Sequence, residues 1–437
     1  MAVRIQRTPS SSGSNSKFTF SCWVKRAALG ALSPMFSAGS SGQSQVVFTA
    51  SDELAVYDGS TVILKTNRKF RDVSAWYHIV VTLDATQSGN DKAKLYVNGV
   101  QETSFATDGR SSFSSLPKAN QSGELQEIGS DGTGNFLGLM THVHMTDNYA
   151  YQASTFGETD STSGIWTPKT SPSVTYGTNG FFLKFENSGN LDLDSSSNNL
   201  TFTTTGTLTQ NVDTPANNFA TLTPLHVLGN VDLPALANGN LTYTGHSSTS
   251  YSGTFSTIAA SSGKWYAEFK CTGGAGAVDM MIGAGMGTFN ATAPGAGTAD
   301  MVVFGYDGRY YTNGSSTVYG DAWVSGDIIG IAMDLDNNKM YIRKNDSAWM
   351  NSGDPTSGST GTGAIPLATS TTEVYHFLLG DYGGSGTPTC ESNFGQGYFG
   401  TTQVASANAD ANGHGIFEYA VPSGYYALNT KNLKEFG

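Results

Sequence analysis

The sequence predicts an all-β protein built of two antiparallel β-sandwiches in tandem. One hairpin pattern in each half of the chain carries this prediction. In the first half, residues 76–84 precede residues 94–100, whose Asn-Gly pair suits a two-residue turn of type I′. In the second half, residues 326–334 run through an Asp-Asn-Asn turn into residues 339–344. The composition agrees, because 53 glycines and only 13% charged residues are typical of a turn-rich β protein.

The predicted first domain covers residues 1–205. Apolar and polar side chains alternate over residues 18–23, as they do in a half-buried strand. Residues 181–185 are expected to close the sandwich against the N-terminal strand, and residues 199–204 to add one more strand. Further strands, separated by Gly and Ser turns, are predicted at residues 45–50, 53–57 and 61–64.

The rest of the chain is predicted to hold a linker and a second domain. Residues 206–228 are rich in Thr, Asn and Pro, which indicates a linker or strap. Residues 229–437 are expected to form the second sandwich. A run of Gly, Ser and Thr at residues 352–363 predicts an exposed loop within it.

Little helix is expected, because long apolar stripes with a period of 3.6 residues are missing from the sequence. Short helical turns are predicted near residues 151–156 and near residues 404–411. Residues 422–433 are expected to be rich in loops and to contain one closing strand.

Charge and cysteine content argue against several kinds of partner and cofactor. The net charge of −12 argues against nucleic acid as the main partner, because phosphate binding needs clustered Lys and Arg. The three cysteines, Cys22, Cys271 and Cys390, lack metal-ligand spacing. Their odd number and wide separation argue against a disulfide framework. They are interpreted as small buried apolar residues.

The sequence shows neither an N-terminal signal peptide nor an apolar run long enough to span a bilayer. The expectation is a protein that is not exported by a general secretion route and does not insert into a membrane. Action outside a cell would then require another path, such as lysis.

Residues 76–99 resemble the laminin-G-like branch of the concanavalin A-like lectin and glucanase superfamily. The resemblance rests on a Trp-x-His strand at residues 76–78 and on the Leu-Tyr-Val-Asn-Gly hairpin at residues 95–99. It implies a jelly-roll sandwich of two antiparallel sheets over residues 4–204.

The second half resembles a SPRY-like domain, which is also a β-sandwich. SPRY-like domains are interaction modules rather than enzymes, so the resemblance implies a binding role without identifying ligand residues. The similar segments are Gly263-Lys264-Trp265-Tyr266-x-Glu268, Gly326-Asp327-x-Ile329-Gly330, Asp334-Leu335-Asp336 and Asn393-Phe394-Gly395.

Several further segments resemble virion structural proteins of tailed bacteriophages, especially marine ones. The resemblance implies a tail fibre, capsid fibre or decoration protein that is assembled in the host cytoplasm and released by lysis. It also implies contacts with other virion proteins and several copies per particle, or a homo-oligomer. The segments lie at residues 7–11, 156–160, 164–169, 176–181, 213–219 and 427–433.

The enzymatic alternative is a glycoside hydrolase, because the concanavalin A-like superfamily includes glucanases with two carboxylates flanking the scissile bond. Those enzymes resemble one another in an E-x-D-x-x-E strand, and the chain contains no such string. Glu124, Glu127 and Asp131 have a different spacing, and Glu158 and Asp160 are isolated. The prediction is a protein that is not an enzyme and has no catalytic residues.

Calcium is the cofactor that the sequence leaves open. Asp192, Asp194, Ser196 and Asn198 alternate oxygen-bearing side chains, and Ca²⁺ prefers oxygen ligands. The loop departs from an EF-hand, and an ordinary turn rich in Asp and Asn explains the same residues. Asp192 and Asp194 are the candidate metal ligands.

His142 and His144 offer a second metal hypothesis. A strand would place both imidazoles on one face, with Asp147 nearby, as in a transition-metal site. Strand histidines that face solvent explain this spacing without a metal.

The candidate ligand-binding residues lie in the second domain, where aromatic and small polar residues are concentrated. Aromatic rings pack on sugar C–H surfaces while polar groups bond hydroxyls, so the segment suits a glycan or a protein. In a hairpin, alternate members would still face the core. The candidates are Tyr306, Asp307, Tyr310, Tyr311, Tyr319 and Trp323.

The sequence therefore predicts a non-catalytic virion surface protein that binds host-surface polysaccharide. The alternative is a purely structural protein that stabilises a capsid or tail and binds no glycan. Exposed aromatic loops would favour adhesion, whereas a large apolar patch would favour the structural role.

Overall fold

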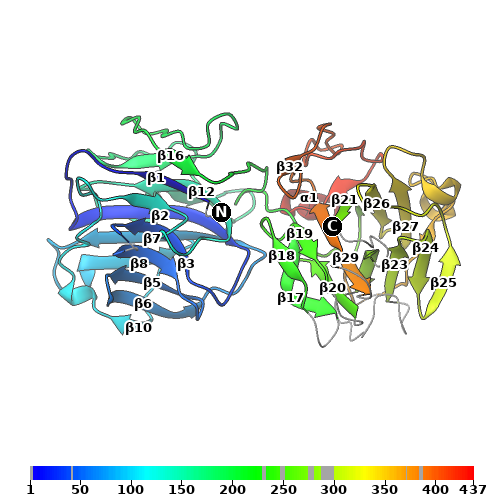
Figure 1. Cartoon of the computed structure of the whole chain (residues 1–437), viewed down its shortest axis with the longest axis horizontal. Helices are drawn as coiled ribbons and strands as arrows, with labels where there is room; N and C mark the ends of the chain where they lie inside the picture. Colours follow the sequence, from blue (N-terminus) through cyan, green and yellow to red (C-terminus); the bar gives the residue numbers. More distant parts are fainter. Residues whose placement is uncertain are drawn as a thin grey trace. The chain divides into compact units, whose positions relative to one another are not determined.

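The computed structural model describes residues 3–40, 43–228, 233–246, 251–273, 280–286, 300–370, 372–382 and 387–437. The chain divides into two compact units, Met1–Gln210 and Asn211–Gly437 (Figure 1). Each unit is built almost wholly of antiparallel strands, so the predicted all-β fold of two sandwiches is confirmed. Among the described residues, no helix has the length and apolar character needed to cross a membrane.

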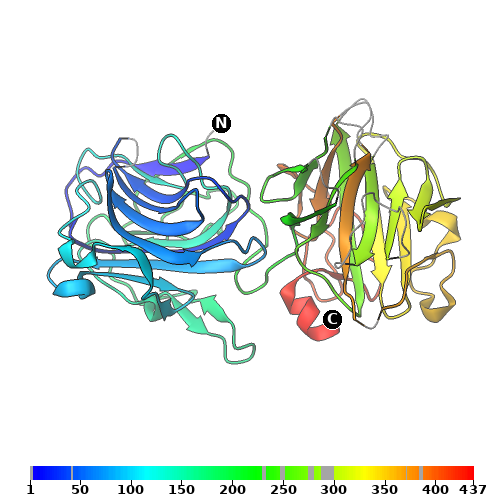
Figure 2. The ribbon, with the colours of Figure 1, turned by 90° about the horizontal axis from the view of Figure 1, so that it is seen from below.

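The first unit packs two sheets face to face (Figure 2). Neighbouring strands of the eight-stranded sheet are, in order, β10 (Phe105–Asp108), β6 (Thr61–Lys69), β5 (Glu53–Asp58), β4 (Ser44–Phe48), β3 (Ser33–Ala38), β11 (Gln126–Ile128), β1 (Arg4–Arg7) and β16 (Thr203–Thr205). Those of the six-stranded sheet are β15 (Phe181–Leu183), β12 (Gly138–Met145), β2 (Lys17–Arg26), β7 (Trp76–Asp84), β8 (Ala93–Val97) and β9 (Val100–Gln101). The short elements are η1 (Gly89–Lys92), η2 (Arg110–Ser112), η3 (Ala153–Thr155), β13 (Gly157–Thr159) and β14 (Trp166–Pro168).

The hairpin predicted in the first half is confirmed. Asn98 and Gly99 connect β8 to β9 with φ angles of 49° and 82°, and two positive φ angles define a type I′ turn. The short turn predicted near residues 151–156 is the 3₁₀ helix η3.

Two strand partners in the first unit differ from the expectation. Strand β15 was expected beside the N-terminal strand, but it pairs with β12. The N-terminal strand β1 instead lies between β11 and β16. Alternation along a strand shows which face is buried but contains no information about the neighbouring strand, so these partners are not specified by the local pattern.

The central strands β2 and β7 of the six-stranded sheet are buried on both faces. Its inner face supplies Phe18, Phe20 and Cys22 to the core between the sheets. Its outer face is covered by residues 151–174, because Val80 and Tyr96 pack there in an apolar cluster with the η3 and β14 segments. The strand predicted at residues 18–23 is therefore not half-buried, since its polar positions are covered as well.

The second unit contains two large sheets. One runs in the order β17 (Leu222–Leu228), β20 (Tyr251–Ser256), β29 (Tyr375–Tyr382), β22 (Met280–Met286), β23 (Met301–Gly305), β24 (Arg309–Thr312) and β25 (Ser315–Val318). The other runs β18 (Ala235–Ala237), β19 (Thr242–Thr244), β30 (Thr389–Asn393), β21 (Lys264–Gly273), β26 (Ile328–Asp334), β27 (Lys339–Lys344) and β28 (Ile365–Pro366), with β33 (Tyr426–Ala427) parallel to β21. Short elements are η5 (Met350–Ser352), η6 (Gly358–Thr360), β31 (Tyr398–Phe399), β32 (Thr402–Gln403) and α1 (Thr430–Phe436).

The segment assigned to a linker, residues 206–228, contains strand β17 at its end. Thr is β-branched and favours strands, and Pro224 is tolerated because β17 is an edge strand whose register shifts between Leu222 and Val227. Residue 229, the expected start of the second domain, lies outside the described residues.

The C-terminal helix α1 was not predicted (Figure 2, red). The side chain of Asn429 caps it by accepting a hydrogen bond from the backbone N–H of Asn432, and Leu433 and Phe436 pack against the core. A helix of seven residues is too short to show a helical period. The helical turn predicted at residues 404–411, all of which are described, is absent.

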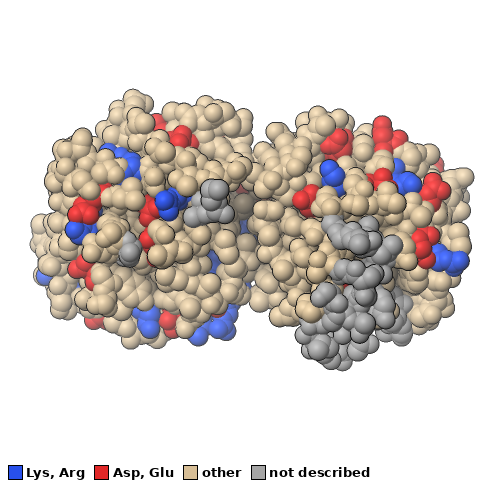
Figure 3. All heavy atoms as spheres, in the orientation of Figure 1, with Lys and Arg blue, Asp and Glu red and all other residues tan. Residues whose placement is uncertain are grey.

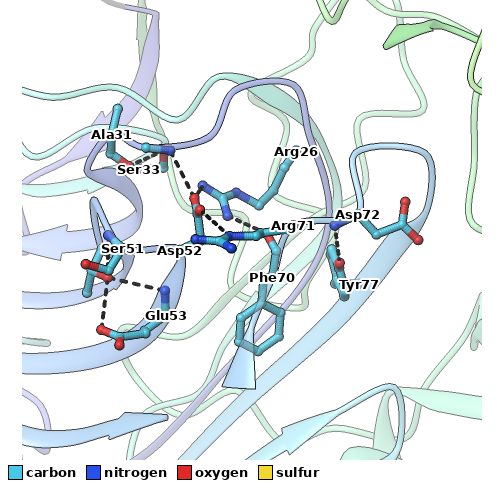
Figure 4. A network of polar contacts seen from close by, with 12 residues as sticks. Arg26, Ala31, Ser33, Ser51, Asp52, Glu53, Phe70, Arg71, Asp72 and Tyr77 are labelled. Atoms are coloured by element: carbon cyan, nitrogen blue, oxygen red, sulfur yellow. Dashed lines mark hydrogen bonds and ion pairs between the residues drawn. The ribbon is translucent and has the colours of Figure 1, made fainter. Parts of the chain in front are cut away.

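A buried ion pair connects strand ends of the two sheets in the first unit (Figure 4). Arg26 at the end of β2 donates to the carboxylate of Asp52 over 3.1 Å and lies over the ring of Phe48. The same carboxylate accepts the N–H of Gly30 and the guanidinium of Arg71. Although burial alone would raise the pKa of Asp52, these donors lower it below its usual value. The pair therefore holds the loop after β2 against the turn before β5.

Replacing Asp52 by Asn should lower the free energy of unfolding by about 3 kcal/mol, because Arg26 would remain buried with its charge uncompensated. Asn tolerates the positive φ of 64° at this position. The matched control is Arg71→Ala: the Arg71 side chain is 59% exposed, and its loss should cost less than about 1 kcal/mol. Urea unfolding measures both; equal losses would contradict the assignment of Arg26–Asp52 as the stabilising pair.

Candidate functional site

A polar pocket in the first unit forms where three strand ends meet. Strand β12 is antiparallel to both β2 and β15, so the end of β12 lies beside the starts of its two neighbours. The loops at these ends line an open pocket of about 480 Å³. Its lining residues are Gly13, Ser14, Asp147, Asn148, Tyr149, Gly177 and Thr178.

The carboxylate of Asp147 holds the walls of this pocket together. One oxygen accepts the N–H of Ser14 at 2.6 Å, and the other accepts the N–H of Asn179 at 3.0 Å. The backbone N–H of Asp147 donates to the carbonyl of Tyr176. Asp147 is only 2% exposed, so its role here is to position three loops rather than to meet a ligand.

Glycine is required at two places in the pocket wall. A Cβ atom at Gly13 would overlap the Asp147 carboxylate, and one at Gly177 would overlap the Asp147 carbonyl oxygen. Gly177 also has a φ of +71°, which favours glycine. The close approach of these loops therefore depends on glycine as well as on Asp147.

The pocket offers uncommitted polar groups beside an exposed aromatic ring. Within the described part of the chain, the side chains of Asn148 and Thr178 have no hydrogen-bond partner and face solvent. Tyr149 is 40% exposed, and its ring stacks on that of Tyr151 with centroids 6.2 Å apart. An aromatic face next to free amide and hydroxyl groups can bind a sugar ring, through stacking and through hydrogen bonds to hydroxyls.

The structure does not gather the six predicted ligand-binding residues of the second unit into one surface. Tyr319 and Trp323 are 6% and 2% exposed and belong to the core. Their polar atoms are satisfied internally, since Tyr319 donates to the carbonyl of Gly363 and Trp323 to that of Gly305. These two residues are therefore core residues rather than surface contacts.

The other four candidates divide between two faces of the sheet. Tyr306 and Tyr310 pack against the core between the sheets, whereas Tyr311 packs on the apolar cluster of the opposite face. Adjacent residues of a strand point to opposite sides, so Tyr310 and Tyr311 cannot contact one ligand face together. The Tyr311 hydroxyl donates to Asp307 at 2.8 Å. Of the six candidates, Tyr311 and Asp307 are thus the pair that lies together on the outer face.

Asp192 and Asp194 serve the local turn. Asp194 is 2% exposed and accepts hydrogen bonds from the N–H groups of Phe182, Ser196 and Leu200 and from the Ser196 hydroxyl. Asp192 accepts the hydroxyl of Thr204. These donors occupy the lone pairs of Asp194 that a cation would need, and the geometry is that of a turn rich in Asp and Asn.

His142, His144 and Asp147 do not converge on a common point. A bulge at His142, where φ is +48°, shifts the register between Thr141 and His144. His144 is buried and hydrogen bonds to the Tyr176 hydroxyl, and Asp147 is committed to backbone donors. In the described ranges, no group of three or more His, Cys, Asp or Glu side chains is placed to hold a metal ion.

A serine and a histidine lie together in the first unit, and sequence reasoning did not find them. Ser21 Oγ and His78 Nε2 are 2.9 Å apart, and the indole N–H of Trp166 donates to His78 Nδ1 over 2.9 Å. An indole nitrogen is only a donor, so Nδ1 accepts and neutral His78 carries its proton on Nε2. His78 therefore donates to Ser21 and cannot act as its base, which excludes a nucleophilic Ser–His pair in this arrangement.

Three of the carboxylates weighed as glucanase residues have structural partners. Glu124 pairs with Lys118 and Glu127 with Arg4, at 2.6 Å and 2.9 Å. Asp131 accepts from Gln45 and from the N–H groups of its own turn. None of these arrangements is a pair of carboxylates facing a cleft.

One carboxyl group has the perturbed pKa expected of a general acid. Burial raises the pKa of Glu268 to about 7. However, Glu268 is fully buried and accepts hydrogen bonds from the N–H groups of Glu418 and Tyr419 and from the Tyr266 hydroxyl. These hydrogen bonds hold the loop at residues 418–419 against β21, and the buried carboxyl group cannot contact a substrate.

Comparison with known proteins agrees with the fold of the first unit. Residues 4–154 match the model of the concanavalin A-like lectin/glucanases superfamily, which confirms the resemblance inferred for this region. No curated protein matches the chain. Among solved structures, the SPRY domain of human HERC1 is similar, with 16% identity and a TM-score of 0.32, over 39% of this chain and 96% of that one.

Replacing Gly177 by Ala should disrupt the pocket wall. Gly164 provides the control, because its φ of +72° is nearly the same but nothing lies within 4 Å of its Cβ position. Gly164→Ala should cost only the backbone strain of about 1 kcal/mol. Gly177→Ala adds the overlap with Asp147 and should lower the free energy of unfolding by about 2 kcal/mol more. Thermal unfolding of both variants measures this, and equal effects would disprove the close contact.

The buried histidines should make the first unit sensitive to acid. Burial lowers the pKa of His78 to about 3 and that of His142 to about 4. The unfolded chain, with a histidine pKa of about 6.5, then binds more protons than the folded one between about pH 6.5 and pH 3. Stability should therefore fall as the pH drops through this window, by up to about 3 kcal/mol at pH 4 from His78 alone.

Urea unfolding at about pH 7 and about pH 4 measures this loss. His78→Gln, which has no titrating group, should show a smaller difference between the two pH values than the natural protein. An unchanged difference would mean that His78 is not the group responsible.

Proposed function

We propose that the protein is a non-catalytic component of a tailed bacteriophage particle that adheres to polysaccharide on the host surface. The observation that carries this proposal is the pocket in the first unit, where Tyr149 is exposed beside the uncommitted side chains of Asn148 and Thr178. The segments that resemble phage virion proteins support the assignment to a phage particle. Two of them, residues 7–11 and 176–181, flank or include residues of the pocket wall.

The match of residues 4–154 to a superfamily of lectins and glucanases supports carbohydrate as the ligand class. Apart from the buried Asp147, the pocket is lined by uncharged residues, which agrees with an uncharged ligand. On the face of the molecule shown in Figure 3, acidic and basic side chains are interspersed and uncharged residues cover most of the area. A polar, open pocket of this kind favours weak binding of a few sugar units. Several copies on one particle would convert weak sites into strong attachment.

A non-catalytic role is supported by the carboxylates of the described residues. Retaining and inverting glycosidases need two carboxyl groups that face the same bond. Asp147, the acid of the pocket, has both oxygens bound to backbone N–H groups, so it is poorly placed to act on a substrate.

A purely structural role in a capsid or tail has its own supporting observation. Strand β25 ends its sheet within the described residues, and all four of its residues are exposed. Val318, the last residue of β25, is 67% exposed, and Val324, six residues further along the chain, is 66% exposed. An open strand edge beside apolar side chains can pair with a strand of a neighbouring subunit.

Binding of the labelled protein to cells of marine bacteria, before and after periodate oxidation of their surface sugars, tests the proposal. Saturable binding that periodate abolishes is expected. Tyr149→Ala should weaken binding roughly tenfold, because aromatic stacking contributes about 1 kcal/mol or somewhat more. The backbone carbonyl of Tyr149, which accepts from Thr19 and Thr146, is unaffected by this change.

Tyr311→Ala is the matched control, since it removes a half-buried tyrosine of the second unit and should leave glycan binding unchanged. If both variants weakened cell binding equally, the pocket could not be the glycan-binding site. Binding that survives periodate would disprove adhesion to glycan. The same conclusion would follow if the protein did not bind even when displayed in many copies. Retained binding to purified capsid or tail proteins would then favour the structural role.

A further inference from the structure

Two cysteines that are distant in the sequence face each other in the second unit. Cys271 on β21 and Cys390 on β30 occupy opposite positions of an antiparallel pair. Their sulfur atoms are 3.1 Å apart, although 119 residues separate them along the chain. The sequence argued against a disulfide framework because of spacing and odd number, but the register of the sheet brings this pair together.

The surroundings of the pair isolate it from the third cysteine. Cys271 and Cys390 are both fully buried in the core of the second unit, next to Tyr243 on β19. Cys22 belongs to the core of the first unit and contacts the sulfur of Met35 at 3.8 Å. The odd number of cysteines is therefore one pair plus one single residue.

We infer that Cys271 and Cys390 are a modification site, at which an intramolecular disulfide forms between β21 and β30 in oxidising surroundings. Residues directly opposite in an antiparallel pair have Cβ atoms about 4.5–5.5 Å apart, and a disulfide needs about 3.5–4.5 Å. The sulfur atoms must approach by about 1 Å to reach the bond length of about 2.05 Å. A small local adjustment of the two strands suffices.

The reaction is a thiol–disulfide exchange with a low-molecular-weight disulfide as the oxidant. The thiolate of one cysteine attacks the oxidant, forms a mixed disulfide and releases one reduced thiol. The second cysteine then attacks the protein sulfur of the mixed disulfide and releases the other half as a thiol. The two protein sulfurs are oxidised, the reagent disulfide is reduced to two thiols, and the two cysteine protons pass to them.

The position of the pair allows slow but selective reaction. Burial raises the pKa of the Cys271 thiol well above its usual value, so little thiolate is present in the closed sheet. Cys271 lies near the end of β21, and Cys390 near the start of β30. Strand ends open more readily than strand centres, and such opening exposes the pair to a small reagent.

The bond would stabilise the second unit by restricting its unfolded chain. A cross-link between residues far apart in sequence removes many unfolded conformations, and these two are separated by 119 residues. The unit would fold with free thiols in a reducing cytoplasm and become more resistant to unfolding once outside it. This inference does not depend on the proposed glycan binding.

The test is a thiol count on the purified full chain before and after incubation with oxidised glutathione. Free thiols are alkylated in denaturant and counted by mass spectrometry. The reduced protein should take up three labels, as its three cysteines require. The oxidised protein should retain only one reactive thiol, at Cys22, and a peptide joining Cys271 to Cys390 should be found. The urea midpoint of the second unit should rise.

Cys22→Ser is the matched control, because it should leave no reactive thiol after oxidation and the same upward shift of the midpoint. Cys271→Ser should give neither the linked peptide nor the shift. If all three thiols of the natural protein stay reactive after prolonged oxidation, or if glutathione adducts form in place of the linked peptide, the inference is overturned. The count on the natural protein decides this even where a variant fails to fold.

Discussion

The pocket of the first unit depends on the hydrogen bonds of one buried carboxylate. Asp147 follows β12, and its oxygens bind the N–H groups of Ser14 and Asn179, which belong to the loops before β2 and β15. Because it is buried, leaving either oxygen without a donor would cost free energy. The three loops must therefore keep their positions, and glycine at Gly13 and Gly177 lets them come close enough. The pocket follows from this constraint.

The fold was largely predictable, because sheet proteins show which face of a strand is buried. Alternation located strands, and the Asn98-Gly99 turn appeared where the sequence placed it. Strand neighbours were harder, since β1 and β15 have partners that no local pattern specifies. The burial of the outer face of the six-stranded sheet could not be predicted either. Trp23 and His78 stack on each other on that face, beneath a covering segment that is distant in the sequence.

The site was much less predictable than the fold. Clustering along the sequence suggested that Tyr310 and Tyr311 act together, but strand geometry sends adjacent side chains to opposite faces. The pocket residues come from three segments, of which the first lies more than a hundred residues before the other two, and only sheet order brings them together. Asp147 was noted in the sequence as a metal ligand, whereas its position just beyond a strand end gives it a structural role.

In the proposed glycan-binding role, the residues that form the distinctive turn at the pocket differ from the residues that would contact the ligand. Residues 176–181 look distinctive because close backbone contacts require glycine at Gly177 and Gly180. The side-chain amide of Asn179 makes two hydrogen bonds, to the carbonyl groups of Ser11 and Asn120. Thr178, within the same turn, has no such constraint and faces solvent. The same holds for Asn148 and Tyr149 beside Asp147. Under the proposed function, substitutions at these free positions would change which sugar is bound, while the residues that form the turn stay as they are.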